Sequence, residues 1–327
     1  MSRNGQLLVL VIKLLRVFNE LKNRDLFNMQ PTKSPPKITN AQKISVIAPS
    51  GALREWERFE QGVKIWRDRG YKLDILAGLS QPYGYLAGTD QQRCQQLIQA
   101  WNDPESVAIA CARGGYGSMR LLENLDWNQL SDRPKWLIGF SDITALLWGF
   151  AKHKGICGLH APVLTTLGDE PERSQQQLFD WLEGKINSIT LSGEGWGNGK
   201  ATGLLLPANL TIATSMIGTT LCPDLEDVIL AIEDVAEPPY KVDRMLTHWR
   251  WSGHLQKVKG IAIGRFSQSQ VSTPSLTMEE VWRDRLSDLD IPIVMYLPFG
   301  HDGENAPLPT GCIAEIDANN GTLSYRN

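Results

Sequence analysis

The stretch Lys135-Trp136-Leu137-Ile138-Gly139-Phe140-Ser141-Asp142-Ile143-Thr144 decides how this chain folds. Its apolar run over 136–140 predicts a short buried strand. A helix is predicted to follow at once over 142–151, because an acidic residue opens it. Ser141 therefore lies at a strand-to-helix corner, which has two interpretations. It is either a nucleophile elbow, although Ile143 replaces the second glycine of G-x-S-x-G, or the N-cap of the helix.

Strands and helices alternate on the N-terminal side of this stretch. Strands are predicted at 43–49, 71–76 and 106–112, and helices at 56–69, 89–101 and 118–125. This alternation predicts an α/β fold with an N-terminal Rossmann-like domain, whose parallel sheet is covered on both faces. Ligands of such sheets bind at the carboxyl ends of the strands. Ser141 and the turn Arg113-Gly-Gly-Tyr-Gly117 both fall there, which indicates a site.

The second half has shorter strands with a different rhythm. They are predicted at 202–206, 227–233, 260–266, 293–297, 313–317 and 322–325, with a hairpin turn at Asn319-Asn320-Gly321. We expect a smaller C-terminal mixed α/β domain of barrel-like, swivelling type. The expected divisions are an N-terminal extension and linker at 1–40, the N-terminal domain at 41–170, a glycine-dense, flexible linker region at 171–200, and the C-terminal domain at 201–327.

The composition excludes several classes of protein. Of the 327 residues, 42% are apolar and 21% are charged, as in soluble globular proteins. A formal net charge of −3 leaves no broad basic surface for nucleic acid or an anionic membrane. The five cysteines are scattered without a C-x-x-C pair. This pattern argues against a disulfide framework or a zinc site and fits a reducing compartment.

The N-terminal extension carries an apolar run at 7–12. The run is far shorter than the ~20 residues of a membrane span. It also lacks the features of a secretory signal. An amphipathic helix is predicted from the helical spacing of Leu7, Leu8, Val11, Leu14, Leu15 and Phe18. Alternatively, Met29 is the true start, and residues 1–28 are then not native protein.

The glycine turn after the third strand has three interpretations. It does not fit a phosphate-binding loop, because neither G-x-G-x-x-G nor Gly-Lys-Ser/Thr is present. Beside a serine nucleophile, a glycine, here Gly115, can offer a backbone N–H to an oxyanion hole, with the N–H of Asp142 as second donor. The remaining interpretation is a plain turn.

A serine nucleophile needs a base, and His301 is the best placed of the five histidines. It follows a strand, on an irregular loop rich in glycine and polar residues. His160, at the end of another strand, is a competitor. Glu233 and Asp234 end an apolar strand and could orient the imidazole. If that strand alternates, Glu233 points inward, and the chain order Ser141, Glu233, His301 is that of α/β-hydrolases.

Five motifs in order resemble one known family. They are Val46-Ile-Ala-Pro-Ser-Gly51, Ala112-Arg-Gly-Gly-Tyr-Gly-Ser-Met-Arg-Leu121, Gly139-Phe-Ser-Asp-Ile-Thr144, Leu230-Ala-Ile-Glu-Asp-Val235, and Gly300-His301 with Leu308-Pro-Thr-Gly311. Together they resemble the LD-carboxypeptidases of peptidase family S66, which include muramoyltetrapeptide carboxypeptidases and microcin C self-immunity peptidases. One departure is Leu206-Pro-Ala-Asn-Leu210, where family members often have Gly-Gly-Asn before the position of Leu210.

The resemblance implies a catalytic triad of Ser141, Glu233 and His301 that works without metal or cofactor. It implies release of C-terminal D-alanine from murein tetrapeptide during peptidoglycan recycling, by a cytoplasmic homodimer that neither enters the membrane nor binds nucleic acid. Arg113 is a candidate for the substrate carboxylate, because its planar fork matches that group, or else it forms a structural ion pair. Tyr116 and Asn209 are further candidates for substrate binding. The alternatives are a microcin C self-immunity-like peptidase acting on a peptidyl-nucleotide amide, and a non-catalytic binder of muropeptides.

Overall fold

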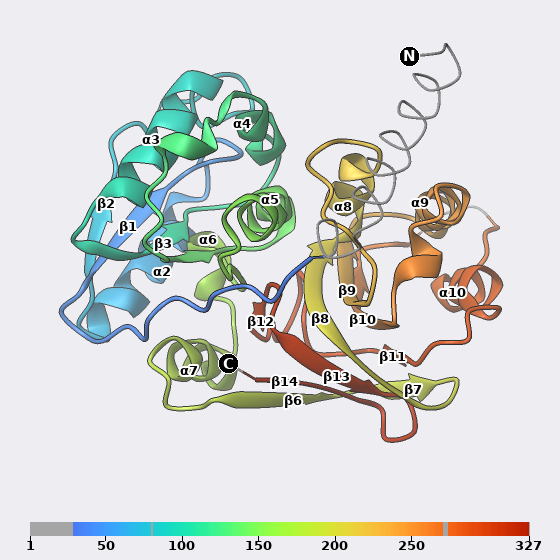
Figure 1. The fold of residues 1–327 in the computed structure, drawn as a ribbon. Helices are drawn as coiled ribbons and strands as arrows, with labels where there is room; N and C mark the ends of the chain where they lie inside the picture. Colours follow the sequence, from blue (N-terminus) through green and yellow to red (C-terminus); the bar gives the residue numbers. More distant parts are fainter. Residues whose placement is uncertain (1–28, 80, 271–273, 327) are drawn as a thin grey trace, which may run out of the picture.

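Two β-sheets lie side by side and are joined by a helical layer (Figure 1). The computed structural model describes residues 29–79, 81–270 and 274–326. The amphipathic helix predicted near the N-terminus lies outside the described residues. No helix within the described ranges is both long and apolar enough to cross a membrane.

The first sheet has the order β12-β5-β4-β3-β1-β2. Its strands are β1 (Lys43–Ile47), β2 (Lys72–Ile75), β3 (Ser106–Cys111), β4 (Trp136–Ile138), β5 (Leu159–His160) and β12 (Leu308–Pro309). All neighbouring pairs are parallel except β12 with β5. The predicted Rossmann-like parallel sheet is confirmed. Its antiparallel edge strand comes from the far end of the chain, which sequence periodicity could not assign.

Helices cover this sheet, and one of them also packs against the second half of the chain. They are α2 (Trp56–Asp68), α3 (Asp90–Asn102), α4 (Ser118–Asn124), α5 (Thr144–Lys154), α6 (Leu164–Leu167) and α7 (Glu172–Leu182). Thr89 caps α3 and forms a capping box with Gln92. Residues 144–151 of α5 are all buried, because this helix packs between the domains. There the Trp148 indole donates to the Pro207 carbonyl at 2.9 Å.

The second sheet has the order β6-β14-β13-β8-β9-β10-β11-β7. Its strands are β6 (Ser188–Ser192), β7 (Glu194–Trp196), β8 (Lys200–Asn209), β9 (Val228–Val235), β10 (Gly260–Ser267), β11 (Ile293–Met295), β13 (Ile313–Asp317) and β14 (Thr322–Arg326). Strands β8 to β11 are parallel, and the others are added antiparallel at the two sides. The helices of this half are α8 (Leu210–Met216), α9 (Pro239–Trp251) and α10 (Met278–Leu286).

The mixed α/β character of the C-terminal half is confirmed, but a barrel is not what forms. Among the described strands the sheet is open, because its edge strands β6 and β7 pair with β14 and β11 and not with each other. The hairpin predicted at Asn319-Asn320-Gly321 joins β13 to β14.

The region 171–200, expected as a linker, contains α7 and both edge strands of the second sheet. Its glycines allow backbones to approach closely. A Cβ placed on Gly195 would lie 1.7 Å from the Ala318 carbonyl oxygen. Packing therefore requires glycine at this position. These glycines indicated flexibility in the sequence, but here glycine allows two backbone segments to approach closely.

Candidate active site

The corner after β4 is a strained elbow. The strand ends at Ile138, a single 3₁₀ turn follows from Ser141 to Ile143, and α5 begins at Thr144. Ser141 has φ +62°, in the left-handed region that residues other than glycine seldom adopt. The N-cap positions belong to Phe140 and Ile143, without side-chain caps. The structure thus favours the elbow over the N-cap interpretation.

Three side chains distant in sequence meet at this elbow. His301 Nε2 lies 3.0 Å from Ser141 Oγ, and His301 Nδ1 lies 2.6 Å from Glu233 Oε2. Ser141 comes from the corner between β4 and α5, Glu233 from β9, and His301 from the loop after β11. The first belongs to one sheet and the other two to the second, so the site forms where the domains meet.

The electrostatics of His301 follow from this geometry. Burial lowers the pKa of the imidazole, but the Glu233 carboxylate counteracts this effect by its charge and hydrogen bond, and the pKa ends above its ordinary value. An ionised carboxylate only accepts hydrogen bonds, so we assign the Nδ1 proton to the contact with Glu233. Nε2 is then free to accept the proton of Ser141 Oγ.

Asn209 lies behind Glu233. It is only 4% exposed, and its amide donates to Glu233 Oε1 at 3.3 Å and to Asp234 Oδ1 at 2.9 Å. Its own oxygen accepts from the N–H of Ile212 and caps α8. Asp234 also accepts from both the N–H and the hydroxyl of Thr211. Asn209, predicted to bind substrate, lies where its amide supports the Glu233 carboxylate.

Burial does not alternate along β9 as the sequence analysis assumed. Glu233 and Asp234 are both buried, because β9 lies between β8 and β10 and both faces of the sheet are covered there. Burial, followed by the charge of Glu233, raises the pKa of Asp234 to about 6. His301 contacts Glu233, whereas Asp234 is bonded to Thr211, so the structure associates Glu233 with the imidazole.

The glycine turn lies directly against the serine. A Cβ on Gly114 would be 3.2 Å from Ser141 Oγ, so Gly114 is the residue of close approach. Gly115 follows with φ +107°. The turn and the elbow are also joined by Ser118, whose N–H donates to the buried Asp142 carboxylate at 2.8 Å. Burial raises the pKa of Asp142.

Arg113 and Tyr116 have different surroundings. The Arg113 guanidinium donates to the Ala52 carbonyl at 2.6 Å and pairs with Glu55 at 3.3 Å. The ion pair considered from the sequence is therefore present. Tyr116 is 49% exposed, and its ring centroid lies 5.8 Å from that of Tyr85, which is 61% exposed. Tyr85 was not identified from the sequence, where no motif includes it.

His160, the competing histidine, is fully buried and packs edge-on against Phe140 and Phe299. Burial lowers its pKa to about 4. It cannot serve as the base, because His301 occupies the position beside Ser141. All five cysteines are free thiols. Over the ranges that the structure describes, no three His, Cys, Asp or Glu side chains gather as a metal site would require.

Comparison with known families gives matches along both halves of the chain. Residues 44–161 match the LD-carboxypeptidase N-terminal domain, and residues 202–316 match the LD-carboxypeptidase C-terminal domain.

Two curated proteins illustrate the range of similarity. The chain is 51% identical to "Putative carboxypeptidase slr1534" of Synechocystis sp., over 89% of this chain and 96% of the relative. It is 31% identical to the murein tetrapeptide carboxypeptidase of Pseudomonas aeruginosa, over 85% of this chain and 94% of the relative.

Solved structures have the same fold. A muramoyltetrapeptide carboxypeptidase from Oxalobacter formigenes superimposes with a TM-score of 0.79 at 28% identity, covering 88% of this chain and 99% of the other. The microcin C7 self-immunity protein MccF, in complex with glutamyl sulfamoyl guanosine, superimposes with a TM-score of 0.83 at 22% identity, covering 90% of this chain and 98% of the other. At that identity the second match supports the fold alone.

Proposed function

This chain belongs to the LD-carboxypeptidase family and is a carboxypeptidase, and on that premise we propose that it releases C-terminal D-alanine from murein tetrapeptide by hydrolysing an L,D peptide bond. The observation that carries the proposal is the continuous hydrogen-bonded line Ser141–His301–Glu233 at the domain junction. A serine, a base within reach and an acid that orients the base are the parts of a nucleophilic acyl-transfer mechanism.

In the first half-reaction, His301 Nε2 takes the proton of Ser141 Oγ while that oxygen attacks the scissile carbonyl carbon. The negative charge that develops on the carbonyl oxygen is bound by the backbone N–H groups of Asp142 and Gly115. Glu233 stabilises the imidazolium and does not itself take the proton. The imidazolium then protonates the departing amino group, and D-alanine leaves.

In the second half-reaction, water replaces the leaving group. His301 takes a proton from this water as it attacks the acyl-enzyme, and it returns a proton to Ser141 Oγ when the ester bond breaks. The free enzyme and a shortened peptide with a new carboxylate result. Every proton passes through one imidazole, so no further acid or base is needed.

A carboxypeptidase must also bind a terminal carboxylate. Arg113 remains our candidate, because its half-buried guanidinium already binds one carboxylate, that of Glu55. A substrate carboxylate would take the place of the Glu55 side chain, which is 38% exposed and can turn to solvent. Tyr116, exposed beside Tyr85, is the candidate for contact with the peptide stem.

The decisive experiment measures D-alanine release from murein tetrapeptide by the wild type, Ser141→Ala and His301→Ala, with and without chelator. We expect release by the wild type, unchanged by chelator, and none by the variants. Activity that survived in Ser141→Ala would exclude the mechanism. If the wild type cleaved only a peptidyl-nucleotide amide, the microcin-type alternative would replace the murein assignment. Binding of muropeptide without any cleavage would indicate a non-catalytic protein.

The cytoplasmic location and the homodimer stay predictions from the resemblance. Cell fractionation tests the first, and sedimentation of the purified chain tests the second.

A further inference from the structure

We propose that Arg93, a buried arginine on α3, is a positioning residue that holds the glycine turn against the elbow and so sets the two backbone N–H groups of the oxyanion hole. The inference rests on the proposed function, since it assigns a role at the same site. Sequence patterns do not single out Arg93, because nothing distinguishes it from the other polar residues of its helix until the fold is known.

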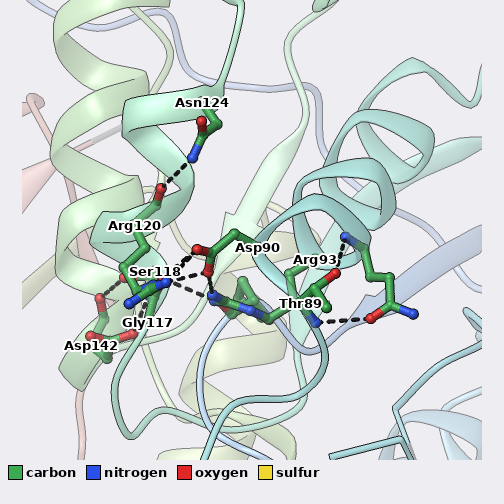
Figure 2. Close-up of polar contacts among 10 residues, drawn as sticks. Thr89, Asp90, Arg93, Gly117, Ser118, Arg120, Asn124 and Asp142 are labelled. Atoms are coloured by element: carbon green, nitrogen blue, oxygen red, sulfur yellow. Dashed lines mark hydrogen bonds and ion pairs between the residues drawn. The ribbon is translucent and has the colours of Figure 1, made fainter. Parts of the chain in front are cut away.

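Arg93 is fully buried, and its guanidinium donates to three oxygens, those of Gly117 and Asp90 among them (Figure 2). Nη1 donates to the Gly117 carbonyl at 2.9 Å and also to the Pro49 carbonyl. Nη2 donates to Asp90. Pro49 follows β1 and Gly117 closes the turn after β3, so one guanidinium joins the carboxyl ends of two neighbouring strands.

Asp90 extends the contact toward the surface. Its carboxylate lies between two guanidinium groups and accepts from Arg120 Nε at 2.9 and 3.1 Å as well as from Arg93 (Figure 2). Arg120 belongs to α4, the helix that begins directly after the glycine turn. The buried charge of Arg93 is thus paired, which a buried cation requires. The same acid also holds the start of α4 in place.

The contact continues from the turn to the nucleophile. Ser118, next to Gly117, donates its N–H to the Asp142 carboxylate at 2.8 Å and its hydroxyl to the Asp142 carbonyl. Asp142 directly follows Ser141. A hydrogen bond from Arg93 to Gly117, the peptide bond to Ser118 and the hydrogen bonds from Ser118 to Asp142 therefore link Arg93 to one proposed oxyanion donor, Asp142. The other proposed donor, Gly115, lies in the same turn, two residues before Gly117.

This arrangement predicts a specific kinetic effect. Oxyanion donors act mainly on the transition state, so a small displacement of Gly115 and Asp142 lowers kcat and leaves KM nearly unchanged. Lysine cannot replace the planar fork, because a single ammonium on a flexible stem cannot keep Pro49, Gly117 and Asp90 in the same geometry. An arginine that only filled space in the core would affect stability without such a split.

The test compares Arg93→Met, Arg93→Lys and Asp90→Asn with the wild type, and uses Arg67→Met, on the exposed face of α2, as the matched control. Two readouts are taken on the folded fraction: kcat and KM for D-alanine release, and the rate at which a fluorophosphonate labels Ser141. The labelling reaction needs the nucleophile and the oxyanion hole but no murein. Thermal unfolding checks that each variant folds.

We expect both kcat and the labelling rate to fall at least tenfold in Arg93→Met, less in Arg93→Lys and Asp90→Asn, with KM changed less than twofold and the control unchanged. Equal labelling of the wild type and the folded Arg93 variants would overturn the inference. If Arg93→Met does not fold, Arg93→Lys and Asp90→Asn decide by the same criterion. A labelled wild type that releases no D-alanine would remove the substrate assignment, and the labelling rates of the variants would then decide this inference by themselves. A wild type that is not labelled would overturn this inference, whereas the substrate assignment depends on D-alanine release alone.

Discussion

His301 and Glu233 are joined by a 2.6 Å hydrogen bond between Nδ1 and Oε2, although 68 residues separate them in the chain. The acid lies near the carboxyl end of a buried strand and the histidine on a loop at the domain junction. This contact sets the proton on Nδ1, directs Nε2 to Ser141 and raises the pKa of the imidazole above its ordinary value despite the opposing effect of burial.

The first prediction concerns pH. The base must be neutral to accept the Ser141 proton, so kcat/KM should fall as the pH drops through the raised pKa of His301, above the ~6.5 of an ordinary imidazole. The pair that stabilises the fold is protonated His301 with the Glu233 carboxylate. Its contribution to stability is therefore present at low pH and is lost as the pH rises through the raised pKa of His301, whereas the activity increases over the same range. Rate profiles and pH-dependent unfolding measure the two effects, and an acid limb below pH ~6 would contradict the assignment.

Glu233→Gln tests the origin of that shift. The amide keeps the size of the side chain but removes the charge that raises the pKa of His301, while burial continues to lower it. We expect the imidazole of this variant to titrate at a lower pH than in the wild type, measured by NMR of the ring protons. Activity should fall by about four orders of magnitude, because the amide can also donate to Nδ1 and so favour the imidazole tautomer whose proton is on Nε2, which cannot accept the Ser141 proton. An unshifted titration would show that Glu233 is not the cause.

Replacement of Ser141 should separate stability from activity. Both Ser141→Ala and Ser141→Gly remove the nucleophile, and we expect a loss of about three to six orders of magnitude in kcat. Glycine accepts the left-handed backbone at φ +62°, so Ser141→Gly should be more stable than Ser141→Ala by about 1 kcal/mol. Urea unfolding of the two variants measures this difference. Equal stability would mean that the elbow is not strained.

Gly114→Ala places a methyl group at the nucleophile. The added carbon would lie 3.1 Å from Ser141 Cβ and 3.2 Å from its Oγ, closer than side chains normally pack. We expect a loss of about 10²-fold in kcat, because a displacement of the reacting groups by ~1 Å has that effect. Gly155→Ala is a suitable control for the substitution, since no atom lies within 4 Å of the added carbon, although its positive φ makes it mildly destabilising. Full activity of Gly114→Ala would show that the turn can retreat from the serine.

Glu170→Gln tests the support of the histidine loop. Glu170, nearly buried in the first domain, accepts from the N–H of Asn305 at 2.8 Å and from the hydroxyl of Ser174 at 2.7 Å. Asn305 in turn accepts from the N–H of Gly300, the residue before His301. Burial raises the pKa of Glu170, whereas the hydrogen bonds from Ser174 and Asn305 favour the ionised carboxylate.

A neutral amide binds these donors less strongly, and the loop that carries His301 should be held less firmly. We expect a lower kcat with KM little changed in Glu170→Gln, and a further loss of about 1–3 kcal/mol of stability in Glu170→Ala, which leaves the donors without an acceptor. Steady-state kinetics and urea unfolding measure both. A change confined to stability would assign Glu170 a purely structural role.

Much of the fold could be predicted from local patterns. Buried parallel strands produce continuous apolar runs, and helices begin at recognisable caps such as Thr89, so the elements of both halves lie close to where they were predicted. The region 171–200 was expected to be a flexible linker because of its glycines. A sequence does not show whether a glycine permits motion or, as at Gly195, a close backbone contact. The open second sheet could not be predicted either, since closure depends on which edges pair.

The sequence by itself determined the alternation of strands and helices, the strand-to-helix corner at Ser141 and the residue types of a serine peptidase, because these depend on neighbours within a few positions. The family resemblance implied Glu233 and His301, but only the tertiary structure shows that these two, and not Asp234 and His160, form the hydrogen-bonded line to Ser141, and that Asn209 lies behind Glu233. The tertiary structure alone revealed Arg93, whose contacts come from chain segments brought together by the sheet. Hydrogen bonds between segments far apart in sequence have no local signature, because they exist only after the strands have packed.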